Sequence, residues 1–197
     1  MNSESPPSFV GAVLAGGSST RMGRDKALVE VDGDPLVRRV ASALARAGAT
    51  RVFVVGGDRP EIEALGLEVV ADRFPGEGPL GGVLTAMSAT ESAVIAILAT
   101  DIVAPDPTTI RAVLDALAGD DVAVPVSGGR RHFHHAVWGR SAQQPLESSF
   151  ASGERAIKRA ARDLAVVEVA GLPAGALADA DTPDELPYTQ GSPRGGR

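Results

Sequence analysis

A short apolar segment near the start of the chain leads into a glycine-rich stretch that is followed by three cations. Residues 9–14 are apolar or glycine, residues 15–20 read AGGSST, and the cations are Arg21, Arg24 and Lys26. Consecutive glycines let the main chain pass close to a ligand and turn its N–H groups toward an anion. The pattern therefore predicts a buried strand that ends in a phosphate-binding loop, with side-chain cations nearby to neutralise the phosphate.

This loop differs from two common phosphate-binding motifs. A P-loop requires G-x-x-x-x-G-K-[ST], but Gly23 is followed by Arg24 and Asp25. The dinucleotide fingerprint G-x-G-x-x-G is also absent from this loop. The pattern that fits is L-A-G-G-x-S-x-R-M-G-x-D-K over residues 14–26. It resembles the signature loop of nucleotidyltransferases that transfer NMP from an NTP, and the match over the whole stretch disfavours an unligated surface loop.

Two further segments carry carboxylates with candidate roles in the same chemistry. Asp101 follows an apolar run, where it can hold Mg²⁺, a cation that prefers oxygen ligands and bridges to substrate phosphates. A lone aspartate at such a position is usually a helix cap or a satisfied turn residue, but the loop signature favours the metal site. The sequence DADTP at residues 179–183 can be a capping turn or can bring in Asp181 as a second carboxylate, and both interpretations stay open.

A histidine cluster follows two arginines in the second half of the chain. In an extended strand, His132 and His134 would share one face and His135 would face the other way. No Cys or Glu lies at the spacing of a metal motif, which disfavours a transition-metal site. We therefore expect a basic rim in which Arg130, Arg131 and one histidine, His132, contact a second anionic substrate.

Strands and helices must alternate along the chain to position these residues. Apolar runs predict strands at 9–15, 51–55, 67–71, 93–99, 121–126 and 165–169. Helical spacing and caps predict helices near 35–47, 80–91, 107–118, 141–151 and 153–163, and a short helix that begins at Pro60. Most of the strands are apolar on both faces, which indicates a three-layer α/β/α sandwich with a mostly parallel, Rossmann-like sheet.

Ligands of such sheets bind beyond the carboxyl ends of the strands. Gly16, Gly56, Asp72 and Asp101 each follow a predicted strand, so we expect them at one edge of the sheet. The segment RFPGEGPLGG at residues 73–82 contains too much Gly and Pro for regular structure and is expected to be a functional loop.

Length and composition restrict the class of protein. The 197 residues predict a single domain over 9–188, with a flexible segment at 1–8 and a disordered tail at 189–197. A net charge of −6 argues against a general nucleic-acid binder, and the absence of cysteine excludes disulfides and Cys-ligated metals. Neither a signal peptide nor an apolar run of about 20 residues is found, so we expect a cytoplasmic protein without membrane contact.

Together these features resemble the molybdenum cofactor guanylyltransferase family, which joins GMP to molybdopterin. The resemblance covers residues 9–187. It rests on the LAGG loop with RMGRDK, the sequence GPLGG at 78–82, Asp101, the turn at 153–155 and DTP at 181–183. The family's fold is of the nucleotide-diphospho-sugar transferase type.

The resemblance implies a reaction in which GMP passes from Mg-GTP to the terminal phosphate of molybdopterin and pyrophosphate is released. It implies catalytic roles for Arg21, Lys26 and Asp101, with Mg²⁺ on Asp101. The implied nucleotide-binding residues are Leu14, Ala15, Gly16, Gly17, Arg21, Lys26, Asp72, Gly82 and Asp101. Transient contact with molybdoenzymes or their chaperones is also implied.

Within this superfamily, the related molybdopterin cytidylyltransferases usually carry LAAG and lack the aspartate, so Gly16 and Asp25 predict guanine. Two features depart from the family pattern: proline is delayed to Pro105 after Asp101, and Asp179 and Asp181 replace the two Asn residues that are common in the terminal motif. A molybdopterin cytidylyltransferase or another small NTP transferase is the alternative within the enzyme class. A non-catalytic adaptor that binds nucleotide or molybdopterin is the alternative outside it.

Overall fold

The computed structural model describes residues 8–16, 25–102, 104–173 and 175. The expectations for Gly17, Arg21 and Asp181, and for the segments 1–7 and 189–197, therefore fall outside the described residues. No helix in the described ranges is both long and apolar enough to cross a membrane.

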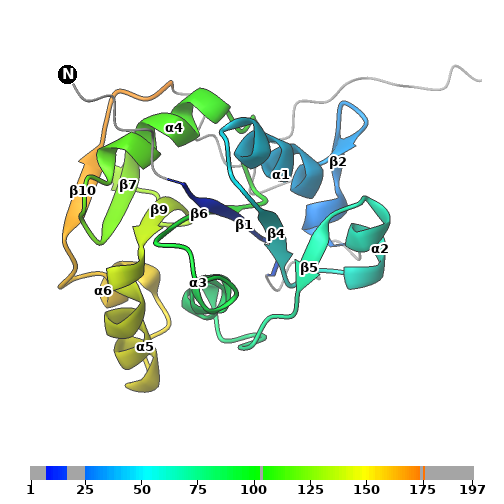
Figure 1. Cartoon of the computed structure of the whole chain (residues 1–197). Helices are drawn as coiled ribbons and strands as arrows, with labels where there is room; N and C mark the ends of the chain where they lie inside the picture. The colour runs from blue at the N-terminus through cyan, green and yellow to red at the C-terminus, as the bar shows by residue number, and fades with distance from the viewer. Residues whose placement is uncertain (1–7, 17–24, 103, 174, 176–197) are drawn as a thin grey trace, which may run out of the picture.

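A mixed sheet of eight strands forms the centre of the molecule, in the order β10-β7-β9-β6-β1-β4-β5, with β8 paired to β7 (Figure 1). The strands are β1 (Val10–Leu14), β4 (Val52–Val55), β5 (Glu68–Val70), β6 (Val94–Ala99), β7 (Val122–Ser127), β8 (Arg130–Arg131), β9 (His135–Gly139) and β10 (Val166–Val169). β1 lies in the middle and runs parallel to both β4 and β6. The predicted strands and the mostly parallel sheet are thus confirmed.

Two strands break the parallel pattern: the short β8, which is antiparallel to β7, and β9. β9 lies between β6 and β7 and is antiparallel to both. It starts only at His135, whose N–H donates to the carbonyl of His132 at 3.0 Å and closes a turn. The expectation that His132 and His134 share a strand face is therefore wrong, because the chain must reverse here to enter β9. Instead, the rings of His132 and His135 stack with their centroids 6.2 Å apart.

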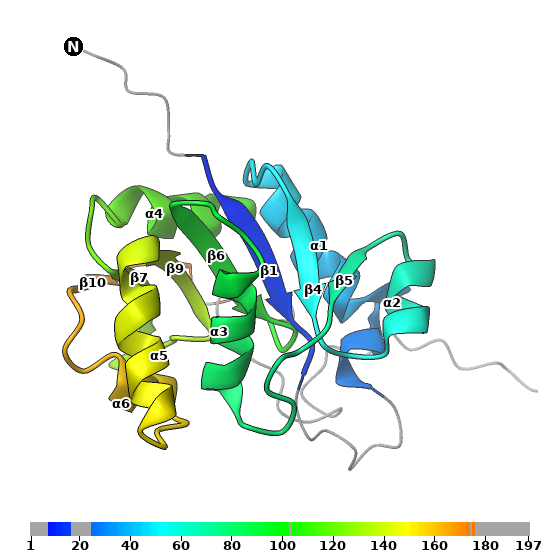
Figure 2. The same cartoon turned by 60° about the horizontal axis from the view of Figure 1, so that its bottom comes forward.

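Helices cover both faces of the sheet and form the expected three layers (Figures 1 and 2). α1 (Leu36–Arg46) and α4 (Pro107–Ala116) pack on one face; α3 (Pro79–Ser88), α5 (Gln143–Ala151) and α6 (Ile157–Ala160) pack on the other. α2 (Arg59–Ala64) lies beside β5. The predicted helix at 153–163 is reduced to α6, because the backbone is left-handed at Gly153 and still extended at Ala156, so that helical structure begins only at Ile157.

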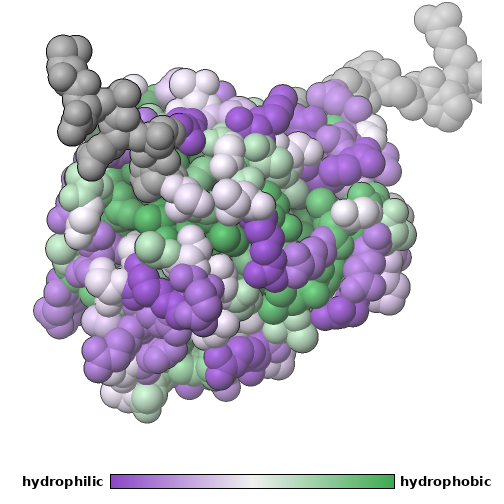
Figure 3. Space-filling model, viewed as in Figure 1, coloured by the Kyte–Doolittle hydropathy of each residue, from purple (hydrophilic) through white to green (hydrophobic). Residues whose placement is uncertain are grey.

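The two faces of β1 show why the sequence forms this sandwich. Val13 points into the core under α1 and α4, whereas Ala12 and Leu14 belong to the core under α3 and α5. Gly11 lets α1 approach closely, since a Cβ atom there would lie 3.0 Å from Cβ of Leu44. Figure 3 shows the result from outside: hydrophobic residues appear in a central band between more hydrophilic regions.

A short hairpin follows the glycine-rich segment. The 3-10 turn η2 (Lys26–Leu28) leads into β2 (Glu30–Val31), which pairs with β3 (Asp34–Pro35). Asp32 and Gly33 form the turn between them with φ of 55° and 76°, the left-handed conformation that an Asp-Gly hairpin turn requires. The hairpin then delivers the chain to the start of α1.

Candidate active site

An open cleft of about 890 Å³ lies beyond the carboxyl ends of the parallel strands. In Figure 2 the arrowheads of β1 and β4 point toward this edge. Its lining includes Gly16, Gly56, Asp72 and Asp101, which follow β1, β4, β5 and β6 respectively. The prediction that these residues meet at one edge of the sheet is confirmed.

Two glycine segments meet main chain to main chain in the floor of this cleft. Gly56 and Gly57 have φ of 73° and 75°, a conformation that side-chain-bearing residues rarely adopt. A Cβ atom at Gly56 would lie 3.6 Å from the main chain of Gly16. A Cβ atom at Gly57 would lie 2.6 Å from Cδ1 of Ile62 and 3.0 Å from Cβ of Ala15. Only glycine fits at Gly57 without a shift of its neighbours, and Gly16 and Gly57 expose main chain in the lining of the cleft.

Asp25 fastens the end of the glycine-rich segment to the loop after β4. Its Oδ1 accepts a hydrogen bond from the N–H of Ala27 at 3.0 Å and caps η2. Its Oδ2 accepts the N–H of Asp58 at 2.9 Å. Lys26, the next residue, is half-buried and does not belong to the cleft lining. The geometry thus gives Asp25, which the sequence marked only as an indicator of guanine, an anchoring role.

Asp72 presents one carboxylate oxygen to the protein and the other to the cleft. Its Oδ1 accepts hydrogen bonds from the N–H of Phe74 at 3.0 Å and from the hydroxyl of Thr85 at 2.9 Å. Its Oδ2 lies 3.8 Å from the position that a Cβ atom would take at Gly16. Sequence reasoning missed Thr85, because its partner Asp72 lies 13 residues away and no motif links the two.

Asp101 stands on the opposite side of the cleft with a different environment. Its side chain is 30% exposed, but its Oδ1 is buried and accepts no hydrogen bond from the described residues. Nε2 of His135, a side chain that is only 3% exposed, lies 3.5 Å from this oxygen. The exposed part of the Asp101 carboxylate borders the cleft and is a suitable oxygen ligand for a hard cation.

The described residues contain no cluster of three or more His, Cys, Asp and Glu side chains that could hold a metal ion by themselves. Mg²⁺ does not need such a cluster, since it is commonly held by one or two carboxylates together with substrate phosphates and waters. Asp101 therefore fits the part that a protein plays in a shared Mg²⁺ site.

The histidine turn contributes a different residue to the cleft from the one expected. His134 is exposed and lines the cleft, whereas Arg130 and His132 do not. Nε2 of His132 lies 2.7 Å from Oγ of Ser127, and Arg131 pairs with Glu168 on β10 at 2.6 Å. The basic rim predicted from the sequence is thus directed toward the β10 edge of the sheet.

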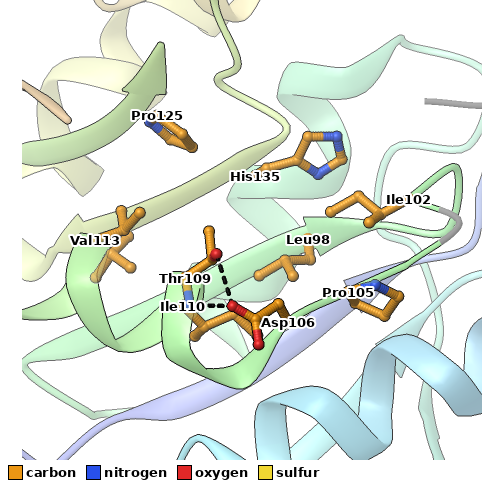
Figure 4. Close-up of a pocket in the computed structure, with 10 residues that line it drawn as sticks. Leu98, Ile102, Pro105, Asp106, Thr109, Ile110, Val113, Pro125 and His135 are labelled. Atoms are coloured by element: carbon orange, nitrogen blue, oxygen red, sulfur yellow. Dashed lines mark hydrogen bonds between the residues drawn. The ribbon is translucent and has the colours of Figure 1, made fainter. Parts of the chain in front are cut away.

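A second, much smaller pocket lies under α4, and its residues are drawn in Figure 4. Its volume of about 20 Å³ leaves room for little more than one water molecule. Asp106 at its rim caps α4 by accepting hydrogen bonds from the N–H and the hydroxyl of Thr109, both at 2.8 Å. The hydroxyl bond is the main cause that lowers the pKa of Asp106. Asp106 and Thr109 in the lining of this pocket thus serve the cap of α4.

Comparison with known proteins places the chain among nucleotidyltransferases. The family model described as MobA-like NTP transferase domain matches residues 11–168. The molybdenum cofactor guanylyltransferase of Rhodobacter capsulatus is 32% identical, over 90% of this chain and 93% of that protein. The probable molybdenum cofactor guanylyltransferase of Pelotomaculum thermopropionicum is 37% identical over 71% of this chain and 67% of that protein.

A solved structure has the same fold. It is the molybdopterin-guanine dinucleotide biosynthesis protein A from Archaeoglobus fulgidus, with a TM-score of 0.69 and 24% identity. The match covers 89% of this chain and 94% of that one. At this level of identity the likeness supports the fold alone, which is the nucleotidyltransferase fold predicted from the sequence.

Proposed function

The chain belongs to the MobA-like NTP transferase domain family, and we propose that it is a molybdenum cofactor guanylyltransferase. In the proposed reaction, the terminal phosphate of molybdopterin attacks the α-phosphorus of GTP. The bond from that phosphorus to the oxygen bridging to the β-phosphate breaks, and pyrophosphate leaves. Relatives named as molybdenum cofactor guanylyltransferases, or probable ones, match this chain over nine-tenths of its length and support this assignment.

The observation that carries the proposal is the pairing of two unlike groups across one cleft. Peptide groups of the glycine segments around Gly16 and Gly56 line one side, and the partly exposed carboxylate of Asp101 lines the other. A nucleoside triphosphate offers an anion to the peptide groups and phosphate oxygens that can share a cation with Asp101. Such a site catalyses transfer by positioning and charge neutralisation, without a covalent intermediate.

Mg²⁺ is the proposed cofactor, with Asp101 as its protein ligand. When bound, the ion neutralises charge on the phosphates of the substrate. Lys26 and Arg21 are proposed to add positive charge beside the same phosphates; Lys26 follows the anchored Asp25, and Arg21 lies outside the described residues.

The second substrate is proposed to enter from the side of the histidine turn. His134 is exposed there and borders the cleft. It directly precedes His135, the first residue of β9, whose Nε2 lies 3.5 Å from Oδ1 of Asp101. A histidine can donate to a phosphate oxygen, which suits the anionic end of molybdopterin. The contacts expected for Arg130, His132 and Asp181, the cytoplasmic location and the contact with molybdoenzymes stay predictions.

Pyrophosphate release tests the function directly. The full chain is incubated with molybdopterin and Mg²⁺, and GTP, CTP, ATP and UTP are supplied in turn. We expect release that requires molybdopterin and is about tenfold or more faster with GTP than with CTP. Faster release with CTP would identify a cytidylyltransferase, and GTP binding without release would identify a non-catalytic adaptor; either result overturns the proposal.

A further inference from the structure

Thr85, a residue of α3, lies directly behind the Asp72 carboxylate. Its side chain is buried, at 1% exposure, and it does not line the cleft. We propose that Thr85 is a positioning residue that aims Asp72 at the nucleoside of the bound nucleotide. This inference rests on the proposed nucleotide transfer, since it assigns a role to Asp72 within the same site.

The hydroxyl of Thr85 stands at the centre of three hydrogen bonds. It accepts the N–H of Arg73 at 3.1 Å, and it lies 2.9 Å from Oδ1 of Asp72 and 3.0 Å from the carbonyl of Gly81. One hydroxyl proton can serve only one of these two acceptors. The bond to Gly81 is the local alternative within a helix, but a charged carboxylate is the stronger acceptor. The proton is therefore directed to Asp72.

These contacts leave the two oxygens of Asp72 unequal. Oδ1 already accepts hydrogen bonds from Phe74 and Thr85. Oδ2 accepts none from the described part of the chain and is turned toward Gly16 and the cleft. Oδ2 thus keeps its lone pairs for donors that the nucleoside provides, which are the ribose hydroxyls and the N–H groups of guanine.

Close packing prevents α3 from shifting away from this arrangement. A Cβ atom at Gly81 would lie 2.9 Å from Cβ of Phe74 and 3.3 Å from its carbonyl oxygen. The first turn of α3 therefore rests directly on the segment that carries Asp72. Thr85, one turn further along, is held at a fixed distance from the carboxylate.

Substitution Thr85→Val removes the hydroxyl and keeps the shape of the side chain. Without its second donor the carboxylate can rotate, and the Arg73 N–H loses its acceptor. We expect the Kd and KM for GTP to rise about tenfold, the effect of one hydrogen bond to a charged group, while kcat stays within about threefold. Thr85→Ser restores the hydroxyl and is expected to return both constants to within about twofold of the wild type.

Thr109 offers a matched control. It is also buried, at 6% exposure, and its hydroxyl also donates to an aspartate, Asp106, but outside the cleft. Thr109→Val is expected to lower the melting temperature and leave the Kd for GTP unchanged. An equal loss of GTP affinity in Thr85→Val and Thr109→Val would show a merely structural role and overturn the inference.

A double-mutant cycle with Asp72→Ala completes the test. If Thr85 acts through Asp72, Thr85→Val has no further effect on GTP affinity once Asp72 is alanine. The same tenfold loss in both backgrounds would overturn the inference. A wild-type chain that prefers CTP would overturn only the guanine assignment, and the same variants titrated with CTP would then decide the role of Thr85.

Discussion

On the glycine wall of the cleft, which comprises residues 14–16, 25, 55–57 and 72, the polar side chains already have hydrogen-bond partners. Both oxygens of Asp25 accept main-chain N–H groups, and Oδ1 of Asp72 has two donors. On the Asp101 wall, which comprises Ala99, Asp101 and His134, the buried Oδ1 of Asp101 has none within the described part of the chain.

The difference agrees with what each wall is proposed to bind. A surface of peptide groups recognises an anion by shape, so its loops must be fixed before the ligand arrives. A carboxylate that is to hold a cation must keep its lone pairs available, and burying such an oxygen without a partner lowers stability. The glycine wall therefore serves stability and binding together, whereas at Asp101 the two requirements oppose each other.

The largest expected effect comes from removing the open carboxylate. Asp101→Ala should lower kcat by on the order of 10²-fold or more, because one well-placed charge contact is lost. Its melting temperature should equal or exceed that of the wild type, because the buried oxygen without a partner is gone. Pyrophosphate release and thermal melting measure the two effects.

Asp106→Ala is the control for this prediction. It removes the cap of α4 only five residues away and should lower the free energy of unfolding by about 1 kcal/mol while turnover persists. A wild-type rate in Asp101→Ala with Mg²⁺ present would contradict the proposal that the Asp101 wall binds the cation while the glycine wall binds the anion.

The next effect concerns the tight packing of the glycine wall. Gly57→Ala should lower the free energy of unfolding by about 2–5 kcal/mol, through left-handed backbone strain and overlap with Ile62 and Ala15. Gly66 has a φ of +78° with nothing within 4 Å, so Gly66→Ala should cost only the strain, about 1–2 kcal/mol. Urea unfolding measures the free energy of unfolding of both variants. Equal losses would show that overlap with Ile62 and Ala15 adds nothing to the backbone strain at Gly57.

The smallest expected effect concerns the hydrogen bonds of Glu154, which lies outside both walls. Hydrogen bonding from the Arg159 side chain, and then from the N–H of Ala156, lowers the pKa of Glu154 to about 2. The turn that Glu154 holds carries Arg155, which pairs with Glu77 in the loop after Asp72.

Because the pKa of Glu154 is lower in the folded state, its stabilising contribution is present above the ordinary pKa of about 4.5 and is lost as pH falls toward about 2. We expect the melting temperature of Glu154→Gln to lie below that of the wild type at pH 6, and the difference to narrow below pH 4.5. Melting curves of both proteins between pH 6 and pH values below 4.5 measure this difference in melting temperature. A difference that does not change with pH would exclude the ionised carboxylate of Glu154 as its source.

The positions at the sheet edge could be predicted from the sequence because the apolar runs end visibly. Parallel strands deliver the residues that follow them to the same edge, so Gly16, Asp72 and Asp101 had to meet. The bounds of each strand could be predicted from the length of its apolar run and from the turn residues that follow it. This part of the site is dictated by secondary structure and topology.

The parts that could not be predicted depend on contacts between distant segments. Thr85 looks like an ordinary helical position, and only the packing of α3 brings it to Asp72. The alternation in HFHH at 132–135 resembles a strand, but the antiparallel direction of β9 requires a turn there and brings His134 to the cleft. Local pattern carries no information about strand direction.

The insertion of β9 between β6 and β7 also fixes the order in which the walls can be assembled during synthesis. Residues 9–70 contain β1, β4 and β5, so the sheet behind the glycine wall can pair as soon as they have emerged. β7 and β10 reach the rest of the sheet only through β9, and β6 keeps a free edge until residue 139 is made. Asp101 therefore leaves the ribosome well before its neighbour His135, and the Asp101 wall of the cleft is the last to close.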